Sequence, residues 1–164
     1  MTAFDDVLSA NLEYASQFGG SGLTGRAGRG LAVVTCMDSR IDPLGLLGLK
    51  PGDAKILRNA GARVTDDVLR TLVLAVYLLG VERVLIMPHT DCGMAKVTDS
   101  QVHDLTFGKG VDTRSLDFQT VPDQGAALRH DLTRVRTSPF LPQGMPVGGA
   151  IYDVLTGRLV RVDL

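Results

Sequence analysis

The sequence predicts one α/β domain in which helices flank a mainly parallel central sheet. Leu31 to Thr35 is a continuous apolar run, which is typical of a strand covered on both faces. A second apolar stretch, Arg83 to Met87, is separated from the first by a long segment with the spacing of an amphipathic helix. Strands that alternate with helices favour a parallel sheet. Because the chain has 164 residues, we expect residues 1–164 to share one core.

The first thirty residues precede this sheet. Apolar residues recur at helical spacing from Ala3 to Phe18, so we predict an amphipathic helix there. Such a helix must bury its apolar stripe on its own domain or on a neighbouring subunit. Half of the residues from Gly19 to Gly30 are glycine, which indicates a loop that is mobile enough to fold over a site.

The later elements follow from apolar periodicity and from the positions of glycine and proline. After Leu31 to Thr35, the expected parallel strands are Ala54 to Leu57 and Arg83 to Met87. The expected helices are Asp42 to Gly48, a helix capped by Thr65 or Asp66 whose buried face runs from Val68 to Leu79 before Gly80 ends it, Met94 to Leu105, and Pro122 to about Arg136. A closing hairpin is expected from Val147 to Leu155 and Leu159 to Leu164. We predict the strand order 2-1-3-4 with a C-terminal edge strand.

Two short segments after the expected strands carry metal-binding residues. Cys36 follows the first strand, and His89 and Cys92 follow the third. Zinc is bound by thiolate sulfur and imidazole nitrogen, and a catalytic zinc has three protein ligands and one open position. In a flavodoxin-like order the first and third strands are neighbours, and ligands bind where the chain leaves them. The sequence therefore predicts a site for one Zn²⁺ per chain formed by Cys36, His89 and Cys92.

Other interpretations of the two cysteines remain open. A disulfide is disfavoured in a reducing compartment, where cysteines are more often free or metal-bound. Two unrelated buried thiols would need no metal. A dithiol redox pair is weakly supported, because Cys36 and Cys92 are not in a Cys-x-x-Cys arrangement.

Residues beside the ligands could assist them. Asp38 and Arg40 are two apart, so their side chains can pair and fix an ionised carboxylate. Asp38 could accept a hydrogen bond from a water on zinc, or become the fourth ligand in a closed state; the alternative is a structural salt bridge. Gly61 and Gly93 would let backbone approach a small substrate, or serve only as turn glycines.

Four neighbouring polar groups receive simpler interpretations. Cys92 precedes an expected helix start, where the helix dipole would favour its thiolate. We interpret Asp91 as a turn or capping residue. His103 and His130 lie in polar stretches and are expected to be solvated.

Charge and hydropathy exclude several classes of partner. The net charge of -1 gives no reason to expect binding to nucleic acid or to an anionic membrane. The amino terminus lacks the pattern of a signal peptide. The longest apolar run, Leu72 to Val81, is about half of the roughly 20 residues that span a bilayer. We therefore expect a cytoplasmic protein.

Three motifs together resemble the β-class carbonic anhydrases, and most of all their compact bacterial and mycobacterial-type members. The motifs are Cys36 to Arg40, Arg58 to Gly61 and His89 to Met94. The resemblance is close over residues 30–98, and it extends by pattern to the leading helix and to Gly149 to Gly157. It implies a zinc lyase, carbonate dehydratase, that reversibly hydrates carbon dioxide to bicarbonate and a proton. Zinc-bound hydroxide, oriented by the Asp38–Arg40 dyad, would be the nucleophile.

The resemblance also implies an assembly. It predicts a homodimer in which the first helix embraces the partner, an active site near the interface, and dimer-based higher oligomers. Relatives on the same scaffold hydrolyse carbonyl sulfide or carbon disulfide, so either is an alternative substrate. A non-catalytic zinc-bearing dimer, closed by Asp38, is a further alternative.

Overall fold

The computed structural model describes residues 2–162 and is built on a five-stranded sheet. The strands are β1 (Leu31–Cys36), β2 (Ala54–Asn59), β3 (Arg83–Met87), β4 (Val147–Tyr152) and β5 (Leu159–Val162). Their order is β2-β1-β3-β4-β5, and only the pairing of β5 with β4 is antiparallel. The predicted parallel sheet with a C-terminal edge strand is confirmed. The last two residues of the expected hairpin, 163–164, lie outside the described residues.

The register of the central strands places their ends at one edge. Leu31 of β1 is opposite both Ala54 of β2 and Arg83 of β3. The buried Thr35 hydroxyl donates to the carbonyl of Met87 at 2.8 Å, which ties the ends of β1 and β3 together. The segments that leave these two strands therefore start side by side.

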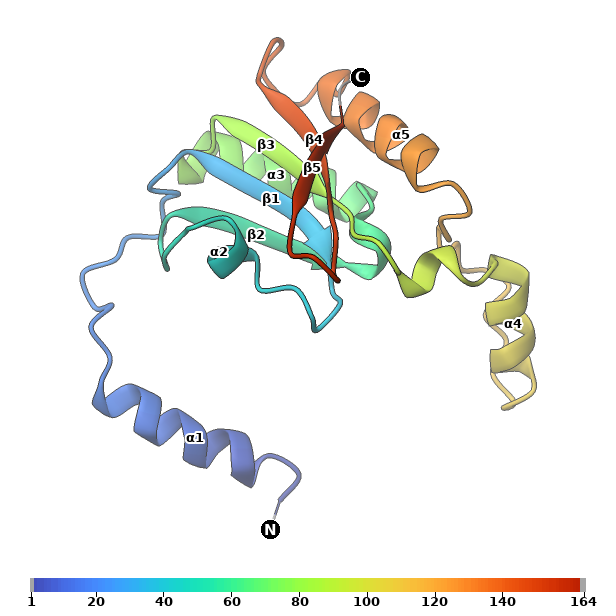
Figure 1. Cartoon of the computed structure of the whole chain (residues 1–164), viewed down its shortest axis with the longest axis horizontal. Helices are drawn as coiled ribbons and strands as arrows, with labels where there is room; N and C mark the ends of the chain where they lie inside the picture. The colour runs from blue at the N-terminus through green and yellow to red at the C-terminus, as the bar shows by residue number, and fades with distance from the viewer. Residues whose placement is uncertain (1, 163–164) are drawn as a thin grey trace.

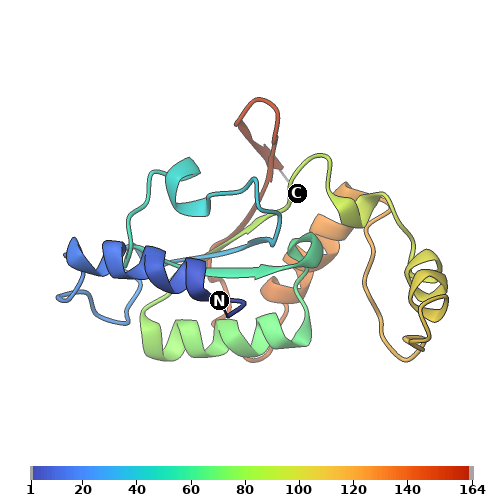
Figure 2. The same ribbon diagram turned by 90° about the horizontal axis from the view of Figure 1, so that it is seen from below.

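Helices lie on both faces of the sheet. The helices of the chain are α1 (Asp5–Ser16), α2 (Pro43–Leu46), α3 (Asp66–Leu79), α4 (Asp99–Phe107) and α5 (Gln124–Arg136), with short 3-10 turns η1 (Ala60–Ala62) and η2 (Gly93–Ala95), and of these α2, α3 and α5 cover the sheet. Figure 2 shows α3 and α5 on one side of the sheet and α2 on the other. The main core lies on the α3 and α5 side, where Leu72 and Leu132 pack with Val34 and Ile86 of the strands. A smaller core on the other face includes Val33 and Met87.

Local signals set the ends of the helices. The Thr65 side chain accepts a hydrogen bond from the amide of Val68, and Gly80 ends α3 with a φ of 73°. Thr65 is therefore the cap of the two expected candidates, and the predicted end at Gly80 is confirmed. The helix expected from Met94 to Leu105 is instead divided, because Thr98 and Gln101 form a capping box that starts a separate α4.

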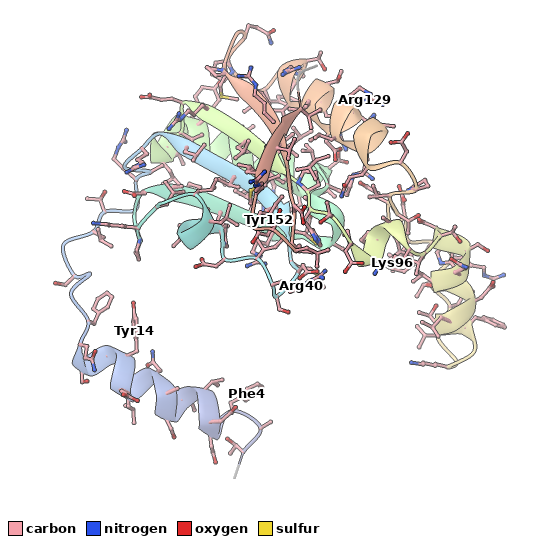
Figure 3. The ribbon with its side chains drawn as sticks, in the orientation of Figure 1. Phe4, Tyr14, Arg40, Lys96, Arg129 and Tyr152 are labelled. Atoms are coloured by element: carbon pink, nitrogen blue, oxygen red, sulfur yellow. The ribbon has the colours of Figure 1, made fainter. Side chains whose placement is uncertain are left out.

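Helix α1 stands away from the rest of the molecule (Figure 1). It is two residues shorter at each end than the predicted segment, and none of its residues is buried. Figure 3 shows Phe4 and Tyr14 far from the sheet. The exposed apolar side chains on or beside α1 are Phe4, Val7, Leu8, Leu12, Tyr14 and Phe18. Within one chain, the option that α1 buries its stripe on its own domain is therefore wrong.

The glycine-rich segment ends at the edge of the sheet where the strands begin. The Ala27 amide donates to the carbonyl of Leu79, and the Gly28 amide donates to that of Gly52. The metal-binding motifs lie at the opposite edge. This loop therefore does not cover the metal-binding motifs of its own chain.

Within residues 2–162, no helix is long and apolar enough to cross a bilayer.

Candidate metal centre

Three buried side chains meet where the chain leaves β1 and β3. Cys36 is the last residue of β1, His89 follows β3 by two residues, and Cys92 precedes η2. Their ligand atoms all lie within 4.8 Å of one another, and the two sulfur atoms are 4.0 Å apart. The structure therefore brings together the three residues that the sequence predicts as zinc ligands.

His89 is prepared to bind a cation. Its Nδ1 lies 2.8 Å from the carbonyl oxygen of Thr90, so Nδ1 carries the proton and donates it. Burial lowers the pKa of His89, which keeps the ring neutral. Among the described residues, its Nε2 is the one buried side-chain nitrogen or oxygen without a hydrogen-bond partner. Such an orphaned acceptor is costly, and a metal ion would satisfy it.

The two cysteine sulfurs of the centre are buried as well. Burial raises the pKa of the Cys92 thiol. The prediction that a helix dipole favours the Cys92 thiolate is wrong, because the turn after Cys92 is the three-residue η2 and not a long helix. Zn²⁺ would offset the cost of burying two thiolates, and it takes sulfur and nitrogen ligands in this combination. The residues present therefore fit zinc.

Asp38 and Arg40 form the predicted pair beside the centre. Arg40 Nε donates to Asp38 Oδ1 at 2.9 Å and Nη2 donates to Oδ2 at 2.7 Å. These bonds hold the pKa of Asp38 well below its usual range. Asp38 Oδ2 is 3.8 Å from His89 Nε2, so the carboxylate borders the position of a bound ion.

Sequence reasoning missed a second carboxylate on Arg40. Asp91 Oδ2 accepts a hydrogen bond from Arg40 Nη1 at 2.8 Å, so Asp91 does more than form a turn. Lys96 and Arg40 together hold the pKa of Asp91 at about 2. Figure 3 shows Arg40 and Lys96 at the same end of the molecule. The only signal in the sequence was the position of Asp91 between two expected ligands.

Two further residues hold the backbone around the ligands. Arg58 donates to the carbonyls of Cys36 at 2.9 Å and Asp38 at 2.6 Å, which fixes the segment after β1. Gln124, at the start of α5, donates to the carbonyl of His89 at 2.5 Å. Arg58 belongs to a recognised motif, but its partners depend on the fold. Gln124 has no local sequence signal.

The two glycines differ in their surroundings. Gly61 is buried with a φ of 78°, a conformation that favours glycine, and a Cβ there would lie 3.4 Å from Met94 and Val121. Gly93 is exposed, and a Cβ would have no neighbour within 4 Å. A turn explains Gly61. Substrate contact by either glycine stays a prediction.

The two other histidines lie outside the centre. His130 is exposed, as expected. The expectation is wrong for His103, which is half-buried: its Nδ1 lies 3.0 Å from the Thr113 hydroxyl and its ring packs against Phe118. These contacts belong to the α4 region.

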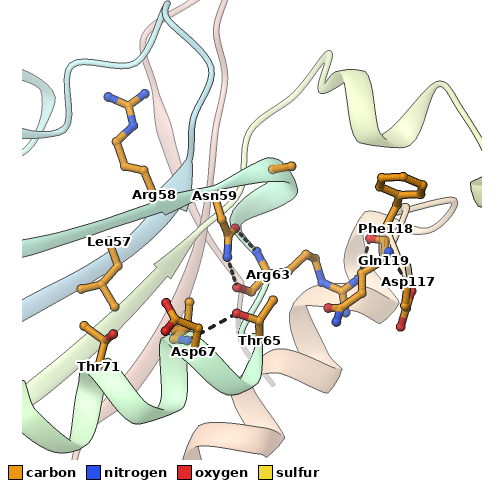
Figure 4. A pocket seen from close by; sticks show the side chains of 12 residues that line it. Leu57, Arg58, Asn59, Arg63, Thr65, Asp67, Thr71, Asp117, Phe118 and Gln119 are labelled. Carbon is orange, nitrogen blue, oxygen red and sulfur yellow. Dashed lines mark hydrogen bonds between the residues drawn. The ribbon is translucent and has the colours of Figure 1, made fainter. Parts of the chain in front are cut away.

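A separate hollow of about 370 Å³ lies beside β2 and the start of α3 (Figure 4). Asn59 and Arg63 bind each other there through two hydrogen bonds, of 2.7 and 2.8 Å. Arg63 also forms a largely buried ion pair with Asp131 at 2.8 Å. None of the three expected zinc ligands lines this hollow.

Comparisons with known proteins agree on one family. The family model described as carbonic anhydrase matches residues 31–115, which include all three expected ligands. The chain is 37% identical to beta-carbonic anhydrase 1 of Mycobacterium tuberculosis over 162 residues, which is 99% of each protein. It is also 30% identical over 155 residues to the carbon disulfide hydrolase of Saccharolobus solfataricus, covering 80% of this chain and 76% of that protein.

The fold gives the same result. The solved structure of the carbonic anhydrase from Streptococcus mutans has a TM-score of 0.93 to this chain and 40% sequence identity. The alignment covers 99% of each chain. The similarity therefore includes α1 as well as the sheet.

Proposed function

The chain belongs to the β-carbonic anhydrase family, whose members are zinc enzymes with carbonate dehydratase activity, and on this premise we propose that it interconverts carbon dioxide and bicarbonate. The observation that carries the proposal is the buried set of Cys36, His89 and Cys92, with the orphaned Nε2 of His89. A set of three ligands leaves the fourth position of a tetrahedral ion open for catalysis.

The ligands and their supports would fix one Zn²⁺ per chain. Zinc would supply the nucleophile by lowering the pKa of a bound water from about 15.7 toward about 7. Thr90 orients the His89 ring through Nδ1, and Gln124 holds the backbone of the same residue. Such outer contacts keep a ligand in one orientation.

Asp38 and Arg40 would orient the reacting groups. Because Arg40 holds Asp38 ionised, the carboxylate can accept a hydrogen bond but cannot donate one. It would therefore accept a hydrogen bond from the nucleophile and so orient a lone pair of that nucleophile toward the carbon of carbon dioxide. While Arg40 holds Asp38, the carboxylate would lie beside the fourth position of a bound ion and leave that position open.

A variant of Asp38 tests this role. We expect Asp38→Ala to lower kcat/KM for carbon dioxide hydration about 10²-fold, because it removes an oriented polar contact at the reacting centre. Asp112→Ala is the matched control, since Asp112 binds Arg114 in the same two-residue spacing away from the centre. Equal rates for Asp38→Ala and wild type would contradict the role of the pair.

The pH dependence gives a second test. Two thiolates cancel the charge of a divalent ion, so the site acidifies water less than three neutral imidazoles would. We expect hydration to increase with pH above neutrality. A flat pH profile would contradict this account.

Carbon disulfide hydrolysis is the second candidate function. The observation that favours it is the 30% identity to a carbon disulfide hydrolase across 80% of the chain. Parallel assays with carbon dioxide, carbonyl sulfide and carbon disulfide on the same zinc-loaded protein distinguish the two. We expect carbon dioxide to have the highest kcat/KM.

We further infer that the chain is a homodimer, or an assembly of such dimers. The support is α1, whose apolar residues are exposed and which stands away from the sheet of its own chain (Figure 1). In a two-fold dimer each copy can cover the α1 helix of the other, because such an interface uses the same surface on both subunits.

A further inference from the structure

We propose that Asp91 is a positioning residue for the reaction: it holds Arg40, and through Arg40 it keeps the Asp38 carboxylate beside the fourth coordination position rather than in it. The inference rests on the proposed function, because it concerns the same centre. The side chain of Asp91 contacts Arg40 and Lys96 and none of the three expected zinc ligands.

Arg40 lies between two carboxylates. Two of its nitrogens, Nε and Nη2, bind the two oxygens of Asp38 at 2.9 and 2.7 Å. Its Nη1 binds Asp91 Oδ2 at 2.8 Å, and Nη2 also reaches the backbone carbonyl of Asp91 at 3.2 Å. Asp38 and Asp91 thus use different edges of the guanidinium. The same Arg40 atom, Nη2, touches both residues.

A second Asp-x-Arg pair shows what Asp91 adds. Arg114 binds Asp112 through Nε and Nη2, and its backbone amide donates to Asp112 Oδ1, as in Asp38 and Arg40. Among the described residues, Asp112 is the one carboxylate that pairs with Arg114. The Arg114 side chain is 73% exposed, compared with 44% for Arg40. The two-residue spacing therefore forms the local pair, and Asp91 supplies the second anchor across the fold.

The second anchor joins the two segments that carry the ligands. Arg40 follows β1, whereas Asp91 lies after β3 between His89 and Cys92. The Asp91 backbone has a φ of 57°, which aspartate and asparagine tolerate better than most residues. Lys96, which contacts Asp91 Oδ1, holds the far side of the same carboxylate.

The functional consequence concerns the equilibrium between two states of Asp38, one paired with Arg40 and one bound to the metal ion. An exposed Asp–Arg pair alone is weak, because ordering a long arginine side chain opposes it. Asp91 orders Arg40 beforehand and so favours the state in which Asp38 is paired with Arg40. Without Asp91, the carboxylate would occupy the fourth coordination position for a larger fraction of the time and exclude other ligands from it.

The test uses Co²⁺ in place of zinc and azide as a probe of the open position, with the visible absorption of the cobalt as the readout. We expect Asp91→Asn to raise the apparent Kd for azide about three- to tenfold, the range for weakening a charge-assisted contact. Asparagine keeps the size and backbone conformation of Asp91 and removes its charge. Asp112→Asn is the matched control and should leave the Kd unchanged.

A double variant separates positioning from a general structural effect. In an Asp38→Asn background, Asp91→Asn should no longer change the Kd for azide, since its effect acts through Asp38. Lys96→Met, which removes only the outer contact of Asp91, should raise the Kd less than Asp91→Asn does.

Either of two results would overturn the proposal. One is an unchanged or lower Kd in Asp91→Asn with cobalt fully bound. The other is an equal rise of the Kd in the Asp38→Asn background. Carbon dioxide hydration by the wild-type zinc enzyme is measured in parallel: if it is absent while the azide results hold, the proposed reaction fails and the positioning role of Asp91 stands.

Discussion

The metal centre and helix α1 differ in how much of their environment one chain provides. Cys36, His89 and Cys92 are all buried, and hydrogen bonds from several segments hold the backbone and side chains around them. In α1 no residue is buried, although Leu8 and Leu12 give it an apolar stripe. The difference teaches that a single chain is sufficient to assemble the ligands but insufficient to cover its first helix.

Removing a ligand tests the centre and has the largest expected effect. We expect His89→Ala to lose zinc and to lower carbon dioxide hydration by about 10³-fold or more, since several kcal/mol of catalysis depend on the metal. Atomic absorption measures the zinc content, and sedimentation velocity measures the oligomeric state. The oligomeric state should not change; a monomeric His89→Ala protein would show that the centre supports the assembly.

Charging the stripe of α1 tests the other region. Leu8→Glu should dissociate the assembly, because burial of a leucine contributes about 1.5–3 kcal/mol and a buried charge opposes association. Zinc should stay at one per chain, since none of the expected ligands is in α1. Ser9→Glu adds the same charge at the adjacent, more polar position and should leave the assembly intact. Loss of zinc in Leu8→Glu would contradict the independence of the two regions.

A smaller effect is expected from the contact that ties β1 to β3. Thr35→Val keeps the shape of the side chain but removes its hydrogen bond to the carbonyl of Met87. We expect the free energy of unfolding to fall by about 1 kcal/mol, the typical value for such a bond. Urea denaturation measures it. A stability equal to that of wild type would show that this contact does not hold the strand ends together.

The smallest effect concerns α4 and its pH dependence. Asp99 accepts hydrogen bonds from the Thr120 hydroxyl at 2.6 Å and from the Phe118 amide at 2.8 Å. The Thr120 hydroxyl is the main cause of its lowered pKa, and the backbone amides of Thr120 and Phe118 add to it. Because this carboxylate has a lower pKa in the folded protein, its ionised form stabilises the fold. The stabilisation is fully present above the unfolded pKa of about 3.9 and is lost as the pH falls through the lower pKa of the folded state.

Hydrogen exchange over residues 99–121 should therefore increase as the pH falls below about 3.9, after correction for the intrinsic rate. Asp99→Asn should show the same increase at neutral pH, while a peptide from β1 should not. Equal exchange in Asp99→Asn and wild type at neutral pH would show that this carboxylate does not stabilise residues 99–121.

Local signals explain how much of the fold was predictable. Gly80 identified the end of α3, and its start was limited to Thr65 or Asp66, because capping depends on adjacent residues. The apolar run of β1 and the two cysteines identified the sheet edge and its ligands. The division at Thr98 was missed because its capping box competes with a weak helical pattern.

Contacts across the fold were less predictable. Asp91 binds Arg40 across 51 positions of the sequence, and Gln124 reaches the carbonyl of His89 across 35. No periodicity or spacing encodes such pairs, since they exist only once β1 and β3 are neighbours. The exposure of α1 was also open, because an amphipathic pattern shows that a helix needs a partner and does not show which chain provides it.

Carbon dioxide hydration measured by stopped flow on protein loaded with increasing amounts of zinc tests the central claim most directly. We predict that kcat per chain rises in proportion to bound zinc, stops rising at one zinc per chain, and increases with pH above neutrality. His89→Ala should stay at the rate without zinc under the same additions. A fully zinc-loaded protein that hydrates no carbon dioxide at any pH, or a rate that is independent of zinc, would contradict the account.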